Sequence, residues 1–225
     1  MAHLLEDDAI FVHVPKAAGS SLVQLFRDAG VYRRPINHEH ATYHEAVSFM
    51  FLRRRGDLLR DARNYLLHLR YARREHYVFG AARHPYTYYP SLYHYLVKRR
   101  ADGVTDWSMI QGIKRWHPWT PFNDAPLDSF EGFLDFMVES FPSYMTGLYY
   151  QYLPPESTHA VRVEQLREDL AKVPVLRDAG ALIAGMKVLN QNRHVPDWRP
   201  ATLDKIYDLE RGLLRRFGYE PIGAG

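Results

Sequence analysis

Short apolar runs alternate with longer segments of helical periodicity along most of this chain. Three runs are expected to form buried strands, namely 9–14 (AIFVHV), 76–82 (HYVFGAA) and 158–163 (THAVRV). Helical spacing of apolar residues follows each of them. Strands that alternate with helices indicate βαβ units, so the predicted fold class is α/β, with a central, mostly parallel β-sheet flanked by helices.

The predicted helices share apolar residues at spacings of three and four, and most have a start or stop signal at one end. They are expected at 19–30, at 42–74, from Pro85 onward, at 129–139, at 164–173 and at 200–217. Residues 103–127 contain prolines and tryptophans and are read as an irregular insertion. No change of composition marks a boundary, so residues 1–225 are expected to form a single domain.

Composition narrows the function classes only slightly. The chain has 225 residues, of which 46% are hydrophobic and 24% charged, as in ordinary globular proteins. It has no cysteine, which excludes disulfides and thiolate metal sites and favours a reducing, cytoplasmic setting. The net charge of +3 is too small to indicate nucleic-acid binding. We expect no signal peptide at the N-terminus and no membrane span, since no apolar stretch approaches about 20 residues.

The segment after the first predicted strand has the features of a phosphate-binding loop. It reads PKAAGSS and comprises Pro15, Lys16, Ala17, Ala18, Gly19, Ser20 and Ser21. Ligands of parallel sheets bind beyond the carboxyl ends of strands, and the start of a helix attracts anions. Gly19 would let the backbone approach the anion closely, and Lys16 would add a positive charge. A Walker loop has its lysine after the glycines, so an ordinary ATPase loop is not matched. The alternative is a capped turn with a surface lysine.

A second candidate phosphate site follows the second predicted strand. Arg83 ends that strand, and Ser91 comes eight positions later on the helix that begins at Pro85. An arginine at a strand end and a serine in the first turns of the next helix can converge on one anion. Two such sites fit a nucleotide that carries two separated phosphates.

At these residues the chain resembles a known family. FVHVPKAAGSSL and VFGAARHPYTYYPSLYHY are similar to two motifs of the sulfotransferases that use 3′-phosphoadenosine 5′-phosphosulfate (PAPS). HAVRVEQLREDL resembles the family's R-x-E-x-L-x-x-D segment, and the residues from Asn190 to Glu220 resemble its closing segment. The resemblance implies a P-loop NTPase-like sulfotransferase fold. It also implies that residues 15–21 bind the 5′ phosphosulfate, that Arg83 and Ser91 bind the 3′ phosphate, and that Asn192 and Arg193 contact the nucleotide.

The chain departs from the family pattern at five positions, which are Ala17, Ala18, His84, Tyr88 and Pro90. Alanines replace a Thr-Gly pair, His84 stands where Asn or Asp is common, and Tyr88 replaces an arginine. Pro90 precedes Ser91 directly and could kink the helix.

The resemblance also implies a general base. HATYHEA resembles an H-x-[TS]-x-x-E segment of bacterial sulfotransferases, which points to His40, with His38 and His44 as the other candidates. The implied reaction transfers a sulfuryl group in line from PAPS to a hydroxyl, or to an amine, of a small-molecule or saccharide acceptor. Lys16 would neutralise the leaving 5′ phosphate, and no metal is required. A metal site formed by His38, His40 and His44 is the competing interpretation.

Two other function classes stay open. A nucleotide-dependent kinase or hydrolase could use the same loop. A non-enzymatic module could bind a polyanion through the arginine-rich segment 53–74. The other interpretations of this segment are a solvated helix face and a binding surface for an acidic acceptor. The aromatic segment 114–124 could form a wall or lid of the acceptor site, or could simply pin the insertion to the core.

Overall fold

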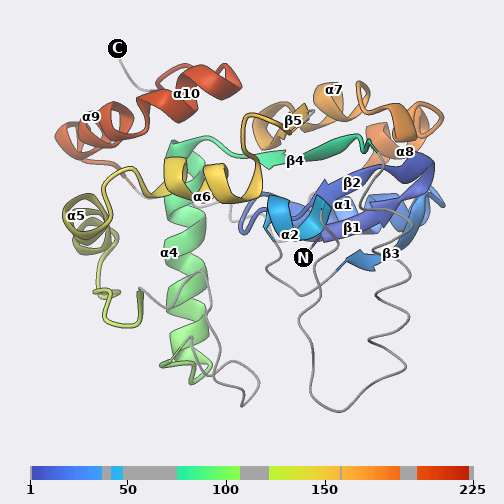
Figure 1. The fold of residues 1–225 in the computed structure, drawn as a ribbon. Coiled ribbons are helices and arrows are strands. Elements are labelled where there is room, and N and C mark those ends of the chain that lie inside the picture. The colour runs from blue at the N-terminus through green and yellow to red at the C-terminus, as the bar shows by residue number, and fades with distance from the viewer. Residues whose placement is uncertain are drawn as a thin grey trace. The chain divides into compact units, whose positions relative to one another are not determined.

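The computed structural model of the chain describes residues 2–36, 42–47, 75–106, 122–157, 159–187 and 197–222. The chain divides into two compact units (Figure 1). Unit 1 comprises 1–82 and 148–190, and unit 2 comprises 83–147 and 191–225. That one sulfotransferase-like domain covers 1–225 stays a prediction.

Unit 1 is built on a five-stranded sheet with the strand order β3-β1-β2-β4-β5. The strands are β1 (Ala2–Leu5), β2 (Ile10–Val12), β3 (Tyr32–Ile36), β4 (Val78–Ala82) and β5 (His159–Arg162). β2, β4 and β5 are the three strands expected from the sequence, and they pair in parallel. β1 pairs antiparallel with both β2 and β3. The α/β class is therefore confirmed, and the sheet is mixed rather than mostly parallel.

The two strands that the sequence pattern did not predict account for this difference. β1 has only four residues, and an acidic 3₁₀ turn, η1 (Glu6–Asp8), separates it from β2. β3 reads YRRPI and alternates between partly buried and exposed residues. It lies at the edge of the sheet formed by the described strands, where a proline is tolerated because none of the other described strands needs its missing N–H. Short and polar strands of this kind carry little periodicity.

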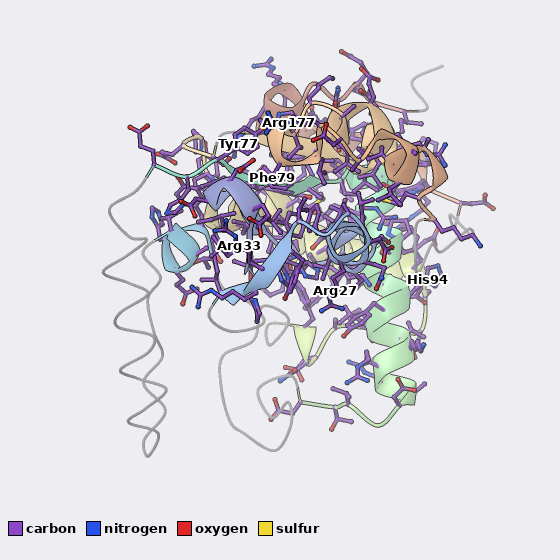
Figure 2. The ribbon with its side chains drawn as sticks, turned by 90° about the vertical axis from the view of Figure 1, so that its right-hand side faces the viewer. Arg27, Arg33, Tyr77, Phe79, His94 and Arg177 are labelled. Carbon is purple, nitrogen blue, oxygen red and sulfur yellow. The ribbon has the colours of Figure 1, made fainter. Side chains whose placement is uncertain are left out.

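Helices pack on the sheet of unit 1 around an aromatic core. They are α1 (Gly19–Asp28), α2 (Tyr43–Val47), α7 (Leu166–Leu170) and α8 (Gly180–Gly185), with 3₁₀ turns η4 (Val163–Gln165) and η5 (Pro174–Leu176). The ring of Phe79, labelled in Figure 2, lies 5.5 Å from that of Phe11 and 5.9 Å from that of Phe26. All three side chains are fully buried. These contacts fix α1 against β2 and β4, and so fix the position at which α1 begins.

Unit 2 is helical in its described residues. It contains α4 (Pro85–Ala101), α5 (Phe130–Ser140), α9 (Pro200–Leu209) and α10 (Arg211–Phe217), and α6 (Tyr144–Tyr152) spans the boundary between the units. α4, α5 and α9 pack against one another. The predicted helices at Pro85 and 129–139 are confirmed, whereas the predicted helix 200–217 is two helices. No helix in the described ranges is both long enough and apolar enough to cross a bilayer.

The break between α9 and α10 falls at Glu210, which is fully buried. Its carboxylate accepts hydrogen bonds from the backbone N–H groups of Met145 and Thr146, at 2.9 and 2.8 Å, and from the Thr146 hydroxyl at 2.7 Å. The Tyr89 hydroxyl donates a fourth, at 3.0 Å. Glu210 therefore caps the N-terminus of α6 from a distant part of the sequence, where the helix dipole favours a negative charge.

Candidate phosphate-binding site

The predicted phosphate loop is a tight turn between β2 and α1 with an unusual backbone. Lys16 has a φ of 63° and Ala18 has a φ of 56°, both in the left-handed region, while Ala17 between them is not. Backbone that alternates in handedness turns successive N–H groups toward one side, and such concave nests bind anions. Each non-glycine residue in this region costs about 1–2 kcal/mol. The loop thus holds a strained shape that suits an anion.

The loop leads directly into the N-terminus of α1, which begins at Gly19. The first N–H groups of a helix have no partner within the helix, and its dipole makes this end positive. Ala18 occupies the capping position and supplies no side-chain hydrogen bond. Of the two serines that follow, Ser20 is exposed and Ser21 is buried. This helix end is therefore without a side-chain cap.

A histidine that the sequence analysis did not select lies against this loop. A Cβ built on Gly19 would come within 2.0 Å of both Cδ2 and Nε2 of His13. Glycine is therefore required here because of the His13 ring, whereas the sequence had suggested that it makes room for the anion. The signal for His13 was its place at the carboxyl end of a buried strand, two residues before Pro15.

His13 belongs to a pair of enclosed histidines on one face of the sheet. Its ring centroid lies 6.3 Å from that of His3 on β1 and 6.2 Å from that of Phe11. Burial is the main cause that lowers the pKa of His13 to about 3, and the positive charge of Lys16 adds to the effect. Burial also lowers the pKa of His3 to about 3, with Arg27 contributing. Both imidazoles are therefore neutral at physiological pH.

The second predicted phosphate site lies at the start of α4, in unit 2. Arg83 is the first residue after β4, and its Nε donates a hydrogen bond to Thr87 Oγ1 at 3.1 Å. Ser91 follows one turn after Thr87 and is buried. Residues four apart share a helix face, so Arg83, Thr87 and Ser91 form one polar stripe along the first two turns. Lys16 belongs to unit 1, whereas Arg83 and Ser91 belong to unit 2.

Structural roles account for His84 and Tyr88, two of the family departures at the start of α4. His84 caps the helix, because its Nδ1 accepts a hydrogen bond from the Tyr86 N–H at 3.1 Å, as an Asn or Asp side chain would. Its Nε2 lies 2.9 Å from the carbonyl oxygen of Glu220 and donates to it. α4 continues through Pro90 with the loss of one backbone hydrogen bond. Tyr88, which replaces the family's arginine, is fully buried.

The segment expected to carry the general base is described only from Thr42 onward. The Thr42 N–H and hydroxyl both donate to Glu45 Oε2, at 2.7 and 3.0 Å, in one half of a capping box for α2. The Thr and Glu of the H-x-[TS]-x-x-E pattern therefore start a helix, and this helix packs on β2. His44 is exposed on it. His40 and His38 lie outside the described residues.

The R-x-E-x-L-x-x-D segment forms an ion pair between its own arginine and aspartate, which we call the Arg162–Asp169 clamp. Arg162 Nε and Nη2 donate to the two carboxylate oxygens of Asp169 at 2.7 and 2.9 Å, and the Arg162 N–H donates at 3.0 Å. Lys172 adds a contact of 3.0 Å. Burial would raise the pKa of Asp169, but these hydrogen bonds outweigh it and hold that pKa well below its usual range. The clamp joins β5 to α7, so it explains the motif without a ligand.

Several other predicted contacts fall in parts of the chain that are not described, namely Asn192, Arg193, the arginines of 53–74 and the tryptophans of 114–124. Over the described ranges, no group of three or more His, Asp or Glu residues could hold a metal ion. Comparison with protein-family models, curated proteins and solved structures finds no match to this chain.

Proposed function

We propose that this chain is a PAPS-dependent sulfotransferase. The observation that carries the proposal is the loop from Pro15 to Ala18, in which two non-glycine residues adopt left-handed backbone just before the uncapped start of α1. Backbone strain of this kind persists where a function requires it. In the proposed function, this loop and Lys16 bind the 5′ phosphosulfate, and the polar stripe of Arg83, Thr87 and Ser91 binds the 3′ phosphate.

The proposed chemistry is an in-line transfer. An acceptor hydroxyl oxygen forms a bond to sulfur while the bond between sulfur and the 5′-phosphate oxygen breaks. His40 takes the proton of the acceptor, and Lys16 offsets the charge that develops on the leaving phosphate oxygen. The products are a sulfate ester and adenosine 3′,5′-bisphosphate (PAP). An amine acceptor would follow the same scheme and give a sulfamate.

The structure offers a physical test of whether the residues suit such a ligand. An anion on the loop would satisfy N–H groups that Ala18 leaves without a side-chain cap, and Lys16 belongs to the same loop. At the start of α4, the Arg83 guanidinium and the Ser91 hydroxyl are donors suited to phosphate oxygens, while the Thr87 hydroxyl donates to the carbonyl oxygen of His84. Each set of donors, taken by itself, therefore suits a phosphate group.

Calorimetry with PAP tests the proposal directly. Lys16→Ala and Arg83→Ala should each weaken binding about tenfold to a hundredfold, since a hydrogen bond to a charged group contributes about 1.5–3 kcal/mol. The matched controls are Lys205→Ala and Arg215→Ala, which remove exposed charges from α9 and α10 and should bind PAP normally. Equal affinity in all four variants would refute the proposed site.

The same assay separates the other function classes. ATP binding that requires magnesium and ignores the 3′ phosphate would support a kinase or hydrolase. Binding of polyanions that falls steeply with salt and is insensitive to Lys16→Ala would support a non-enzymatic module. A screen with labelled PAPS against sugars, phenols and lipids then identifies the acceptor, and His40→Ala should abolish transfer while PAP binding persists.

A further inference from the structure

The side chain of His13 is aimed at the phosphate loop. It lies between β2 and Pro15, and the atoms closest to a Cβ built on Gly19 are its Cδ2, Nε2 and Cε1, at 2.0, 2.0 and 2.6 Å. The ring edge that carries Nε2 therefore faces the first residue of α1. This edge therefore lies beside the N-terminus of α1, the end of a helix that attracts anions.

Neither ring nitrogen of His13 has a hydrogen-bond partner within the part of the chain that the structure describes. The imidazole is nearly enclosed by protein, although part of the residue still reaches solvent. The nitrogens of His13 are not among the fully enclosed side-chain atoms that lack a partner in the described ranges, whereas His3 Nε2 is, so a ligand can reach the ring of His13. The ring lies against Phe11, His3 and the Gly19 backbone.

His3 provides a comparison within the same unit. It is buried, and its Nε2 also lacks a partner in the described ranges, but its Nδ1 lies 3.4 Å from the Tyr32 hydroxyl. The three atoms nearest to a Cβ built on Gly19 all belong to His13 and none to His3. The two histidines thus lie side by side, and His13 is the one that packs against the start of α1.

We infer that His13 is a ligand-binding residue of the phosphate loop, which donates a hydrogen bond from Nε2–H to an oxygen of the anion held by Lys16 and the start of α1. This inference rests on the proposed function and adds a residue to its 5′ phosphosulfate site. A fully deprotonated phosphate or phosphosulfate has only acceptor oxygens, so the ring must carry its proton on Nε2. As a neutral donor, His13 adds a directional contact without placing a second cation beside Lys16.

Three variants separate binding from packing. His13→Phe keeps an aromatic ring against Gly19 and removes the donor, whereas His13→Gln keeps an N–H group. His3→Phe is the matched control, because it changes the neighbouring enclosed ring in the same way. PAP affinity measured by calorimetry should fall about tenfold to a hundredfold in His13→Phe, which corresponds to one hydrogen bond to a charged group. It should fall less in His13→Gln and stay unchanged in His3→Phe.

A spectroscopic measurement covers the case in which His13→Phe does not fold. In the wild-type protein, the ¹⁵N resonance of His13 Nε2 should move and its proton should become protected from exchange when PAP is added. The corresponding His3 resonances should stay in place. A ring that only packs against Gly19 would show no such change, so a fixed Nε2 signal at saturating PAP would overturn the inference.

The outcomes also distinguish this inference from the proposed function. If wild type binds PAP and His13→Phe binds it equally well, only the role of His13 is wrong. If wild type does not bind PAP, the proposed function fails, and inorganic pyrophosphate then becomes the probe of the loop. Pyrophosphate binding that weakens in His13→Phe would support the inference without the proposed function, and no binding of either probe would reject both.

Discussion

The two enclosed histidines of unit 1 predict a specific loss of stability in mild acid. The pKa values of His3 and His13 are about 3 in the folded protein, compared with 6.5 for an ordinary histidine. Between these values the unfolded chain binds a proton at each histidine and the folded chain does not. The free energy of unfolding therefore falls as pH decreases through 6.5 and goes on falling toward 3.

The size of the effect follows from the same values. The slope is about 1.4 kcal/mol per pH unit for each histidine that is charged only in the unfolded chain. Integrated from about pH 7 to about pH 5, this gives about 2 kcal/mol for each histidine and about 4 kcal/mol for both. The depressed pKa of Asp169 acts in a lower range, below about pH 4, so it leaves this interval unaffected.

Urea unfolding followed by far-ultraviolet circular dichroism at about pH 7 and about pH 5 measures the loss. The comparison between wild type and variants removes the contributions of the other histidines. In His3→Phe the acid loss should be smaller by about 2 kcal/mol, and in the double variant with His13→Phe by about 4 kcal/mol. His3→Phe should keep its stability at pH 7, because it removes a buried nitrogen that lacks a partner in the described ranges. An acid loss of the same size in wild type and both variants would refute the reasoning.

Three further substitutions test contacts at the loop and in the two units. Gly19→Ala should destabilise unit 1 by about 1–3 kcal/mol and abolish PAP binding, because the new Cβ would overlap the ring of His13, as thermal unfolding and calorimetry would show. Glu210→Gln should lower the free energy of unfolding by about 2–4 kcal/mol in urea, since it weakens four buried hydrogen bonds. Asp169→Asn should cost about 3 kcal/mol at neutral pH, and the difference from wild type should shrink steadily as pH falls below about 4, because the unfolded wild-type carboxyl group then takes up a proton while the folded carboxylate keeps its charge.

Each of these substitutions has a matched control. Gly212→Ala places a Cβ in open space on α10 and should stabilise or leave the protein unchanged. Glu139→Gln and Asp178→Asn remove exposed carboxylates and should have effects below about 0.5 kcal/mol. A test variant that behaves like its control would show that the corresponding contact does not stabilise the fold.

Short sequence patterns predicted the strands and helices that depend mainly on residues close together in the chain. β2, β4 and β5 are apolar runs, and α4 begins at Pro85 as its fixed φ suggests. The sequence did not predict β1 and β3, because their place in the sheet depends on pairing with β2 rather than on their own periodicity. It also did not predict the break at Glu210. The reason for that break is the N-terminus of α6, which lies more than sixty residues earlier in the chain.

In the candidate site, too, the sequence predicted features that depend on neighbouring residues and missed those that depend on how the chain folds. The sequence identified the loop from Pro15 to Ser21, since composition and position next to a strand are local features. It did not identify His13, because the contact between its ring and Gly19 depends on how the loop folds back. Nor did it separate residues that bind a ligand from residues that shape the backbone, since Arg162 and Asp169 read equally well in either role.

The structure now separates these two roles, and the separation determines which residues bear on function. Folding alone explains the Thr42–Glu45 capping box, the Arg162–Asp169 clamp and the cap formed by His84, since each satisfies backbone groups or charges within its own unit. Their agreement with sulfotransferase motifs therefore says little about the ligand. The loop at Lys16 differs, because its left-handed backbone costs free energy. A bound anion would offset this cost, so the case for a phosphate-binding enzyme depends on this loop rather than on the number of motifs that match.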